Sequence, residues 1–173
     1  VVTFLMLARE CGAKVPDHMF NGALRHFFRY AGRGNNPYGD NRPEVGFVDN
    51  GKNGKLAFAM AAAAALTPEG ENSLYARARD VCAIQSFYTT TFMLHGHTGG
   101  GIGEIWRSAA MGLLHDKKPG QYRDFMDSRK WHYDLSRRFD GSFCILGGSG
   151  YDKELWGVAY PLTYTIPRKT LRI

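Results

Sequence analysis

The sequence has no apolar stretch long enough to cross a membrane as a helix. Its longest such stretch, Leu56 to Leu66, contains eleven residues, whereas a membrane-spanning helix needs about 20. The opening residues, Val1 to Leu7, are apolar, but they lack the basic flank and the small-residue cleavage site of a signal peptide. These residues therefore predict neither a membrane span nor a leader.

Cysteine is scarce, and long runs of like charge are absent. The three cysteines, Cys11, Cys82 and Cys144, are odd in number, far apart and outside any metal-binding spacing, so we predict buried free thiols. The formal net charge is +6, but the basic residues stand singly or in short pairs such as Lys117-Lys118. This scatter indicates a solvated basic surface and predicts no nucleic-acid partner.

Apolar residues make up 44% of the 173 residues, which is enough for one globular domain over residues 1–173. Between Pro16 and Gly32 they recur with the period of a helix, with polar residues on the opposite face. We expect Asp17 to cap this helix, and Gly32 or Gly34 to end it in the left-handed conformation. The segment therefore has the pattern of an outer helix with one buried face.

A long glycine-rich loop over residues 33–53 follows, and the next segment, 56–66, is apolar on every face. A helix of that kind is surrounded by other helices, and its run of alanines lets those neighbours approach closely. An outer helix, a loop and an inner helix therefore form the first unit of the chain.

The same order of outer helix, loop and inner helix returns twice, over 72–86, 98–101 and 102–114, and again over 120–138, 139–152 and 153–162. Trp106 and Trp156 occupy matching places about fifty residues apart. The segment Val1–Cys11 has the pattern of one more inner helix. The chain thus consists of helical hairpins that repeat roughly every fifty residues.

A single hairpin cannot bury its apolar face, so hairpins at a fixed period stack into a solenoid or close into a ring. The alternation of outer amphipathic and inner apolar helices favours the ring. The predicted fold is therefore all-α, a partial α/α toroid of antiparallel hairpins with long glycine-rich loops at one end. Because a ring of six hairpins needs about 300 residues, we expect a longer chain or a second copy to complete it.

The Asp140-Gly141-Ser142-Phe143 segment, together with this rhythm of hairpins, resembles a known superfamily. The rhythm is similar to that of the α/α toroids in terpenoid cyclases, protein prenyltransferase β-subunits and several polysaccharide lyases and glycosidases, and the segment resembles the Asp-Gly-Ser-aromatic turn of the cyclase branch. The pattern also resembles an uncharacterised bacterial family in which such a toroid accompanies a PDZ domain. The resemblance implies a fold and leaves the reaction open.

Each inner helix follows a long loop, so the loops and the inner-helix amino termini should share one end of the ring and form a site there. Helix amino termini favour anionic groups, and aromatic side chains near them can stack on sugar rings. For the tryptophans, packing inside the ring explains the pattern equally well. The residues expected to bind substrate are Asn36, Asp40, Arg42, His95, Trp106, Tyr151 and Trp156.

The residues expected to act in catalysis are Tyr38, His97, Glu104 and Asp140. An imidazole such as that of His97 titrates near neutrality, so it could transfer a proton, hold a metal or order its loop. No third ligand stands at a diagnostic spacing, and neither a metal nor a cofactor is predicted. Glu104 and Asp140 could divide acid and base duties as in glycosidases, although an aspartate such as Asp140 often forms a turn instead.

These patterns favour a carbohydrate-active hydrolase or lyase that acts on a polysaccharide or another extended polymer. The alternative is a non-catalytic scaffold or a peptide-binding or protein-binding module, because the agreement with every enzymatic motif is weak. A loop-rimmed cavity with convergent polar groups would favour the enzyme, and a filled centre would favour the scaffold.

Overall fold

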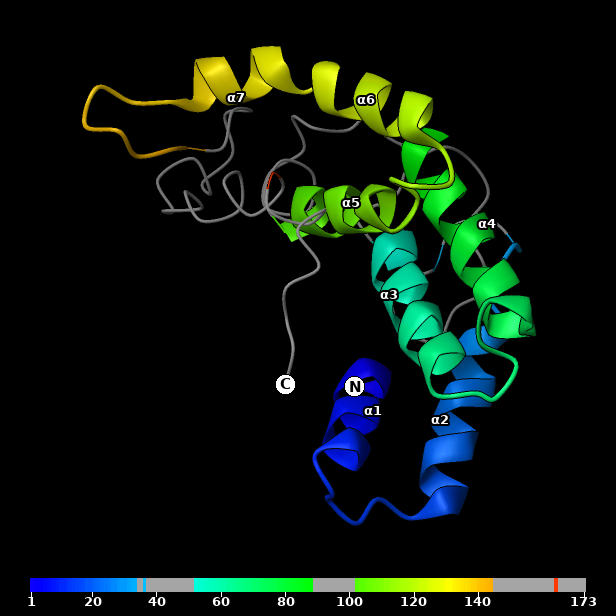
Figure 1. Cartoon of the computed structure of the whole chain (residues 1–173). Helices are drawn as coiled ribbons and strands as arrows, with labels where there is room; N and C mark the ends of the chain where they lie inside the picture. The colour runs from blue at the N-terminus through cyan, green and yellow to red at the C-terminus, as the bar shows by residue number, and fades with distance from the viewer. Residues whose placement is uncertain (34–35, 37–51, 89–101, 145–163, 165–173) are drawn as a thin grey trace.

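The computed structural model describes residues 1–33, 36, 52–88, 102–144 and 164, and the regular elements in these ranges are helices (Figure 1). They are α1 (Val2–Glu10), α2 (Asp17–Phe28), α3 (Lys52–Ala65), the short 3-10 helix η1 (Gly70–Asn72), α4 (Leu74–Tyr88), α5 (Ile102–Leu113), α6 (Pro119–Asp127) and α7 (Lys130–Ser136). An isolated antiparallel bridge joins Arg137 to Phe143, and the described residues form no strand. The all-α prediction is confirmed. Among the helices of these ranges, none has the length and apolar character to cross a membrane.

Figure 1 shows the helices as a curved wall, with α1, α3 and α5 on the concave side and α2, α4, α6 and α7 on the convex side. Helix α3 is central, because it packs most extensively against α4, then against α5, and also against α1. Helix α1 packs on α2, and α5 packs on α6. Each inner helix therefore contacts the next inner helix and carries an outer helix on its back. The expected inner segment 153–162 lies outside the described residues.

The core lies where α3, α4 and α5 meet, and small residues determine how closely these helices pack. Ala57, Ala83 and Ala110 are completely buried, together with Met60 and Met111. The short alanine side chains let the helix axes approach, and the flexible methionines fill the spaces that remain.

Gly54, in the first turn of α3, marks a close approach between α3 and α5. A Cβ atom at this position would overlap the backbone carbonyl of Trp106 and would lie 3.2 Å from the amide nitrogen of Arg107. Because both obstacles are backbone atoms, no rotamer change could relieve the overlap. Only a residue without a side chain fits here.

We expect Gly54→Ala to lower the free energy of unfolding by about 1–3 kcal/mol, because the added methyl group forces α3 away from α5. Urea unfolding followed by circular dichroism measures the change. Gly22→Ala is the matched control, since a Cβ atom in the middle of α2 meets nothing within 4 Å and alanine favours a helix by up to about 1 kcal/mol. Equal stability of the two variants would contradict the close packing.

Two helix ends can be compared with the sequence pattern in detail. Gly32 has a φ of +74°, the left-handed conformation expected after the α2 segment. Helix α3 begins at Lys52, so the last two residues of the expected loop already belong to the helix. Asn36 is held against this first turn, because its backbone amide donates to Oδ1 of Asn53 at 3.2 Å and its side chain donates to the Lys52 carbonyl at 3.2 Å.

The expectation of one continuous helix over 120–138 is wrong, because two helices meet at Ser128 and Arg129. The Ser128 hydroxyl donates to the Phe125 carbonyl at 2.6 Å, and the Arg129 amide donates to the Met126 carbonyl at 3.1 Å. Both contacts span three residues, as in a tightened last turn, and therefore end α6. The break allows the Arg129 side chain to turn inward towards Glu104.

Two smaller expectations also need correction. Asp17 is the first residue of α2 and does not cap it; its carboxylate pairs with Arg9 at 3.1 Å. Cys82 is buried as expected, but Cys11 is exposed and Cys144 is only partly buried. Whether a cysteine is buried depends on its position in the folded chain, and the composition of the chain does not give that position.

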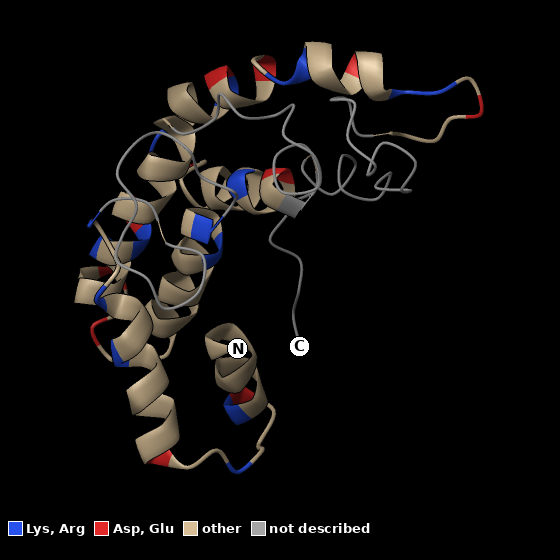
Figure 2. Cartoon of the chain, turned by 180° about the vertical axis from the view of Figure 1, so that it is seen from behind, with Lys and Arg blue, Asp and Glu red and all other residues tan. Residues whose placement is uncertain are grey.

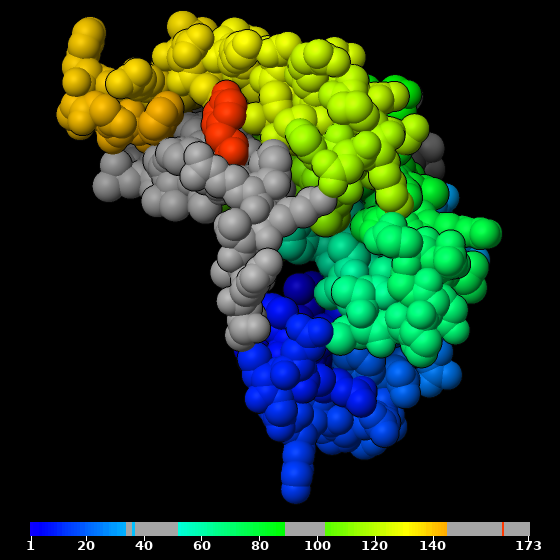
Figure 3. All heavy atoms as spheres, viewed as in Figure 1, coloured from blue at the N-terminus to red at the C-terminus, as the bar shows by residue number. Residues whose placement is uncertain are grey.

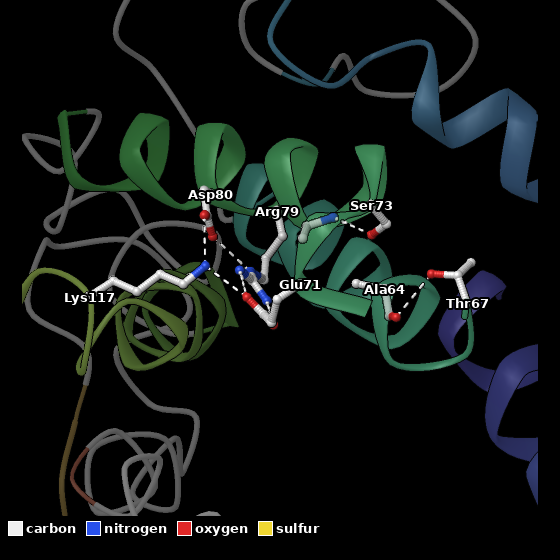
Figure 4. Close-up of polar contacts among 8 residues, drawn as sticks. Ala64, Thr67, Glu71, Ser73, Arg79, Asp80 and Lys117 are labelled. Carbon is white, nitrogen blue, oxygen red and sulfur yellow. Dashed lines mark hydrogen bonds and ion pairs between the residues drawn. The ribbon is translucent and has the colours of Figure 1, made fainter. Parts of the chain in front are cut away.

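An ionic cluster ties η1 and α4 to the connection between α5 and α6 (Figure 4). The two terminal nitrogens of Arg79 donate to the two carboxylate oxygens of Glu71 at 2.6 and 2.8 Å, and the Arg79 side chain is 7% exposed. Lys117 donates to Glu71 at 2.8 Å and to Asp80 at 3.1 Å. The Arg79 hydrogen bonds, followed by that of Lys117, lower the pKa of Glu71 from 4.5 to about 2.

Because the pKa of Glu71 is lower in the folded chain than in the unfolded chain, its carboxylate stabilises the fold fully above pH 4.5, and this stabilisation is lost as the pH falls towards 2. We therefore expect Glu71→Gln to lower the urea midpoint at pH 7, and the deficit to shrink between pH 4.5 and 2. Glu10→Gln, which removes an exposed carboxylate of α1, is the control. A deficit that does not depend on pH would refute the ionic origin of the stabilisation.

Candidate functional site

A cavity of about 450 Å³ opens at the amino-terminal ends of α1 and α3 and beside the first turns of α5. In the space-filling view a hollow separates the blue atoms of α1 from the teal atoms of α3 (Figure 3). Its described lining comprises Val1, Val2, Thr3, Phe4, His26, Phe27, Tyr30, Asn36, Lys52, Lys55, Leu56, Ala59 and Trp106. The starts of three inner helices thus contribute to one cavity on the concave side.

Trp106 supplies the largest aromatic surface of this lining. Its ring is half-buried, and the ring of Phe58 packs edge-on against it with the centroids 5.7 Å apart. The ammonium nitrogen of Lys55 lies 5.9 Å from the centre of the Trp106 ring. The backbone of Trp106 also contacts Gly54. Residues of α3 therefore contact both the ring and the backbone of Trp106.

His26 of α2 and Tyr30, in the turn after this helix, also line the cavity, and the sequence pattern did not select either. Their rings meet edge-on at 5.6 Å, and the Arg29 side chain donates to the Tyr30 hydroxyl at 2.9 Å. The sequence pattern placed His26 on the polar side of an outer helix. The signal that could have found the pair is their spacing of four residues at the end of the expected helix, which brings two polar aromatic side chains close together.

Two of the residues expected to bind substrate, Asn36 and Trp106, line the cavity together. Asn36 is 9% exposed, and its two hydrogen bonds to the start of α3 give it a structural role as well. Two expected catalytic residues, Glu104 and Asp140, are described but do not belong to this lining. The remaining expected site residues lie outside the described residues: Tyr38, Asp40, Arg42, His95, His97, Tyr151 and Trp156.

Glu104 is fully buried in a polar cluster that joins α5 to the α6–α7 junction. Its Oε1 accepts hydrogen bonds from Arg129 Nε at 2.7 Å and from the Tyr133 hydroxyl at 3.0 Å. Its Oε2 lies 3.6 Å from Arg107, which is also fully buried. The Arg129 guanidinium rests on the Phe125 ring, 3.5 Å from its centre. One carboxylate thus balances two buried guanidinium groups.

His132, on α7, is completely buried near this cluster. Burial lowers its pKa, Glu104 opposes that effect, and the positive charges of Arg129 and Arg107 add to the lowering. The imidazole is therefore neutral near pH 7, and the cluster carries no third positive charge from this residue.

Asp140 lies in an exposed turn after α7. Its Oδ1 accepts hydrogen bonds from the Ser142 amide at 2.9 Å and from the Ser142 hydroxyl at 2.7 Å, and these bonds lower its pKa. Gly141, between them, has a φ of +83°. The interpretation of Asp140 as a turn-forming residue is therefore confirmed.

We expect Glu104→Gln to lower the free energy of unfolding by about 3–5 kcal/mol, because it removes the carboxylate that pairs with the buried Arg129 guanidinium. Chemical denaturation at pH 7 tests this. Asp127→Asn removes one partner of an exposed ion pair with Lys130 in the same region and should change stability little. If the two variants lost the same amount, Glu104 would not be the charge that holds this cluster.

A family model described as Domain of unknown function (DUF6288) matches residues 1–173. This match covers every helix from α1 to α7. No curated protein and no solved structure matches the chain.

Proposed function

We propose that this chain is a carbohydrate-active hydrolase or lyase whose substrate site is the cavity at the starts of α1, α3 and α5. The chain belongs to the family described as Domain of unknown function (DUF6288). The observation that carries the proposal is the composition of this lining. It combines a tryptophan ring with imidazole, amide and ammonium groups in about 450 Å³. Cavities that hold small organic ligands are of this size and combine apolar walls with a few polar groups in this way.

The chemistry of a sugar explains why this combination is suitable. A sugar ring has an apolar face of C–H groups, which can stack on an indole such as that of Trp106. Its edge carries hydroxyl groups. These can accept a hydrogen bond from the Lys55 ammonium, and they can donate a hydrogen bond to the His26 imidazole or accept one from it. The lining therefore offers both kinds of contact that one sugar unit needs.

His26 and Tyr30 are the described residues that we propose for proton transfer. Histidine and tyrosine both serve as general acids and bases, and both side chains line the cavity. The segment 37–51 begins and ends at cavity residues, Asn36 and Lys52. This connection supports Tyr38, Asp40 and Arg42 as further members of the site.

Helix α5 follows the segment 89–101 and contributes Trp106 to the cavity. This connection supports His95 and His97 as candidates, and we retain Tyr151 and Trp156 from the sequence pattern. Glu104 and Asp140 have the structural partners described above, and the proposal does not use them.

We also propose that the curved wall is part of an α/α toroid. The support is the alternation of inner and outer helices and the shared cavity at the starts of the inner ones. In this proposal, further residues of a longer chain or a second copy complete the ring.

One observation favours the alternative of a protein-binding scaffold. Trp131, Leu135 and Phe139 are large apolar side chains on α7 and just after it, and they are 48%, 66% and fully exposed. Trp131 and Leu135 are four residues apart and so share a helix face. An apolar face of this kind can dock another protein.

The enzymatic proposal is tested by incubating the intact chain, and any longer parent chain, with a panel of polysaccharides. Released reducing ends indicate hydrolysis, and ultraviolet absorbance of unsaturated products indicates elimination. We expect Trp106→Ala to lower kcat/KM on an accepted polymer about tenfold, which corresponds to about 1.4 kcal/mol of lost stacking.

Trp106→Phe keeps an aromatic ring and should retain most of the activity, and circular dichroism shows whether both variants fold. A folded parent that releases no product from any polymer of the panel would contradict the enzymatic proposal and favour the scaffold.

A further inference from the structure

We infer that the cavity takes a sugar unit carrying an acidic group, either a carboxylate or a sulfate, and that Lys55 recognises that group. This inference rests on the proposed function, because it assumes that the cavity of α1, α3 and α5 holds a sugar. It goes further by naming the chemical class of the ligand and the residue that selects it.

The first argument is the position of the Lys55 ammonium group. Lys55 is exposed, lines the cavity, and holds its nitrogen 5.9 Å from the centre of the Trp106 ring. A sugar stacked on that ring presents its substituents around the edge of the ring. An acidic substituent on the side of Lys55 therefore comes within reach of the ammonium group and forms a charge-assisted hydrogen bond.

The second argument is the charge of the lining. Among its described residues, Lys52 and Lys55 are basic, while none is an aspartate or a glutamate. Figure 2 shows basic residues at the start of α3. A cavity whose described charges have one sign attracts a ligand of the opposite sign.

The third argument is a comparison with other lysines. Lys117 is paired with Glu71 and Asp80, and Lys130 is paired with Asp127. Within the described part of the chain, Lys55 forms no ion pair and contacts the Trp106 ring instead. Its charge is thus available to a ligand, whereas the charges of the other two are paired with carboxylates.

The packing of α3 on α5 keeps the ammonium group and the ring together. Gly54 precedes Lys55, and its backbone lies against the backbone of Trp106. The positions of Lys55 and Trp106 relative to each other are therefore set by a backbone contact. Gly54 is a positioning residue for both.

The test measures the affinity of the intact chain for three probes by isothermal titration calorimetry. The probes are neutral cello-oligosaccharides, carboxylated oligogalacturonates and sulfated chondroitin oligosaccharides of equal length. We expect the parent to bind one acidic probe at least tenfold more tightly than the neutral probe. The preferred acidic probe identifies the group as a carboxylate or a sulfate.

Lys55→Gln should remove this preference, so that the acidic and neutral probes bind with similar affinity, and Lys55→Arg should restore most of it. Lys14→Gln removes the same charge from the exposed connection between α1 and α2 and should have no effect. Trp106→Ala should weaken the binding of all probes, because it removes the stacking surface.

Two results would overturn the inference while leaving the proposed function intact. In the first, Lys55→Gln leaves the affinity for every acidic probe unchanged while Trp106→Ala weakens binding of the neutral one. In the second, Lys14→Gln reduces acidic binding as much as Lys55→Gln does, which would indicate general attraction to a basic surface. If the parent binds none of the probes, both the inference and the proposed function fail.

Discussion

The contact between the backbones of Gly54 and Trp106 is the constraint on which the rest of the cavity depends. At Gly54 the side chain is a single hydrogen atom, which lets the backbone of α3 contact the backbone of α5. The same contact brings Lys55 and Phe58 of α3 to the Trp106 ring and so joins two inner helices at one rim. A wider separation would place the ammonium group and the ring too far apart to contact one ligand.

A cluster of buried charged side chains outside the cavity lining also holds α5 in position. Glu104 and Arg107 lie on the helix that carries Trp106, and they are completely buried against Arg129 and Tyr133. A carboxylate in such a place is costly unless it is paired, so the Arg129 guanidinium and the Tyr133 hydroxyl, which both bind Glu104, help to determine how α5 sits against the α6–α7 junction. The residue that the sequence pattern selected for catalysis thus shows a structural role in holding the helix that lines the cavity.

The hydropathy pattern predicted the helices well, because helix periodicity and glycine punctuation are local properties. The expected segments 102–114 and 72–86 differ from α5 and α4 by no more than two residues at either end. The break between α6 and α7 could not be predicted in the same way. Helix α6 ends in the three-residue hydrogen bonds of Ser128 and Arg129, and neither residue is a glycine or a proline that would mark a helix end in the sequence.

The sequence by itself determined the helical class and two members of the cavity, Asn36 and Trp106. Only the tertiary structure decided that His26 and Tyr30 line the same cavity and that Glu104 is buried among arginines. The physical reason is that periodicity reports which face of a helix avoids water. Which polar groups meet depends on how the helices cross, and that is set by contacts between residues far apart in the chain.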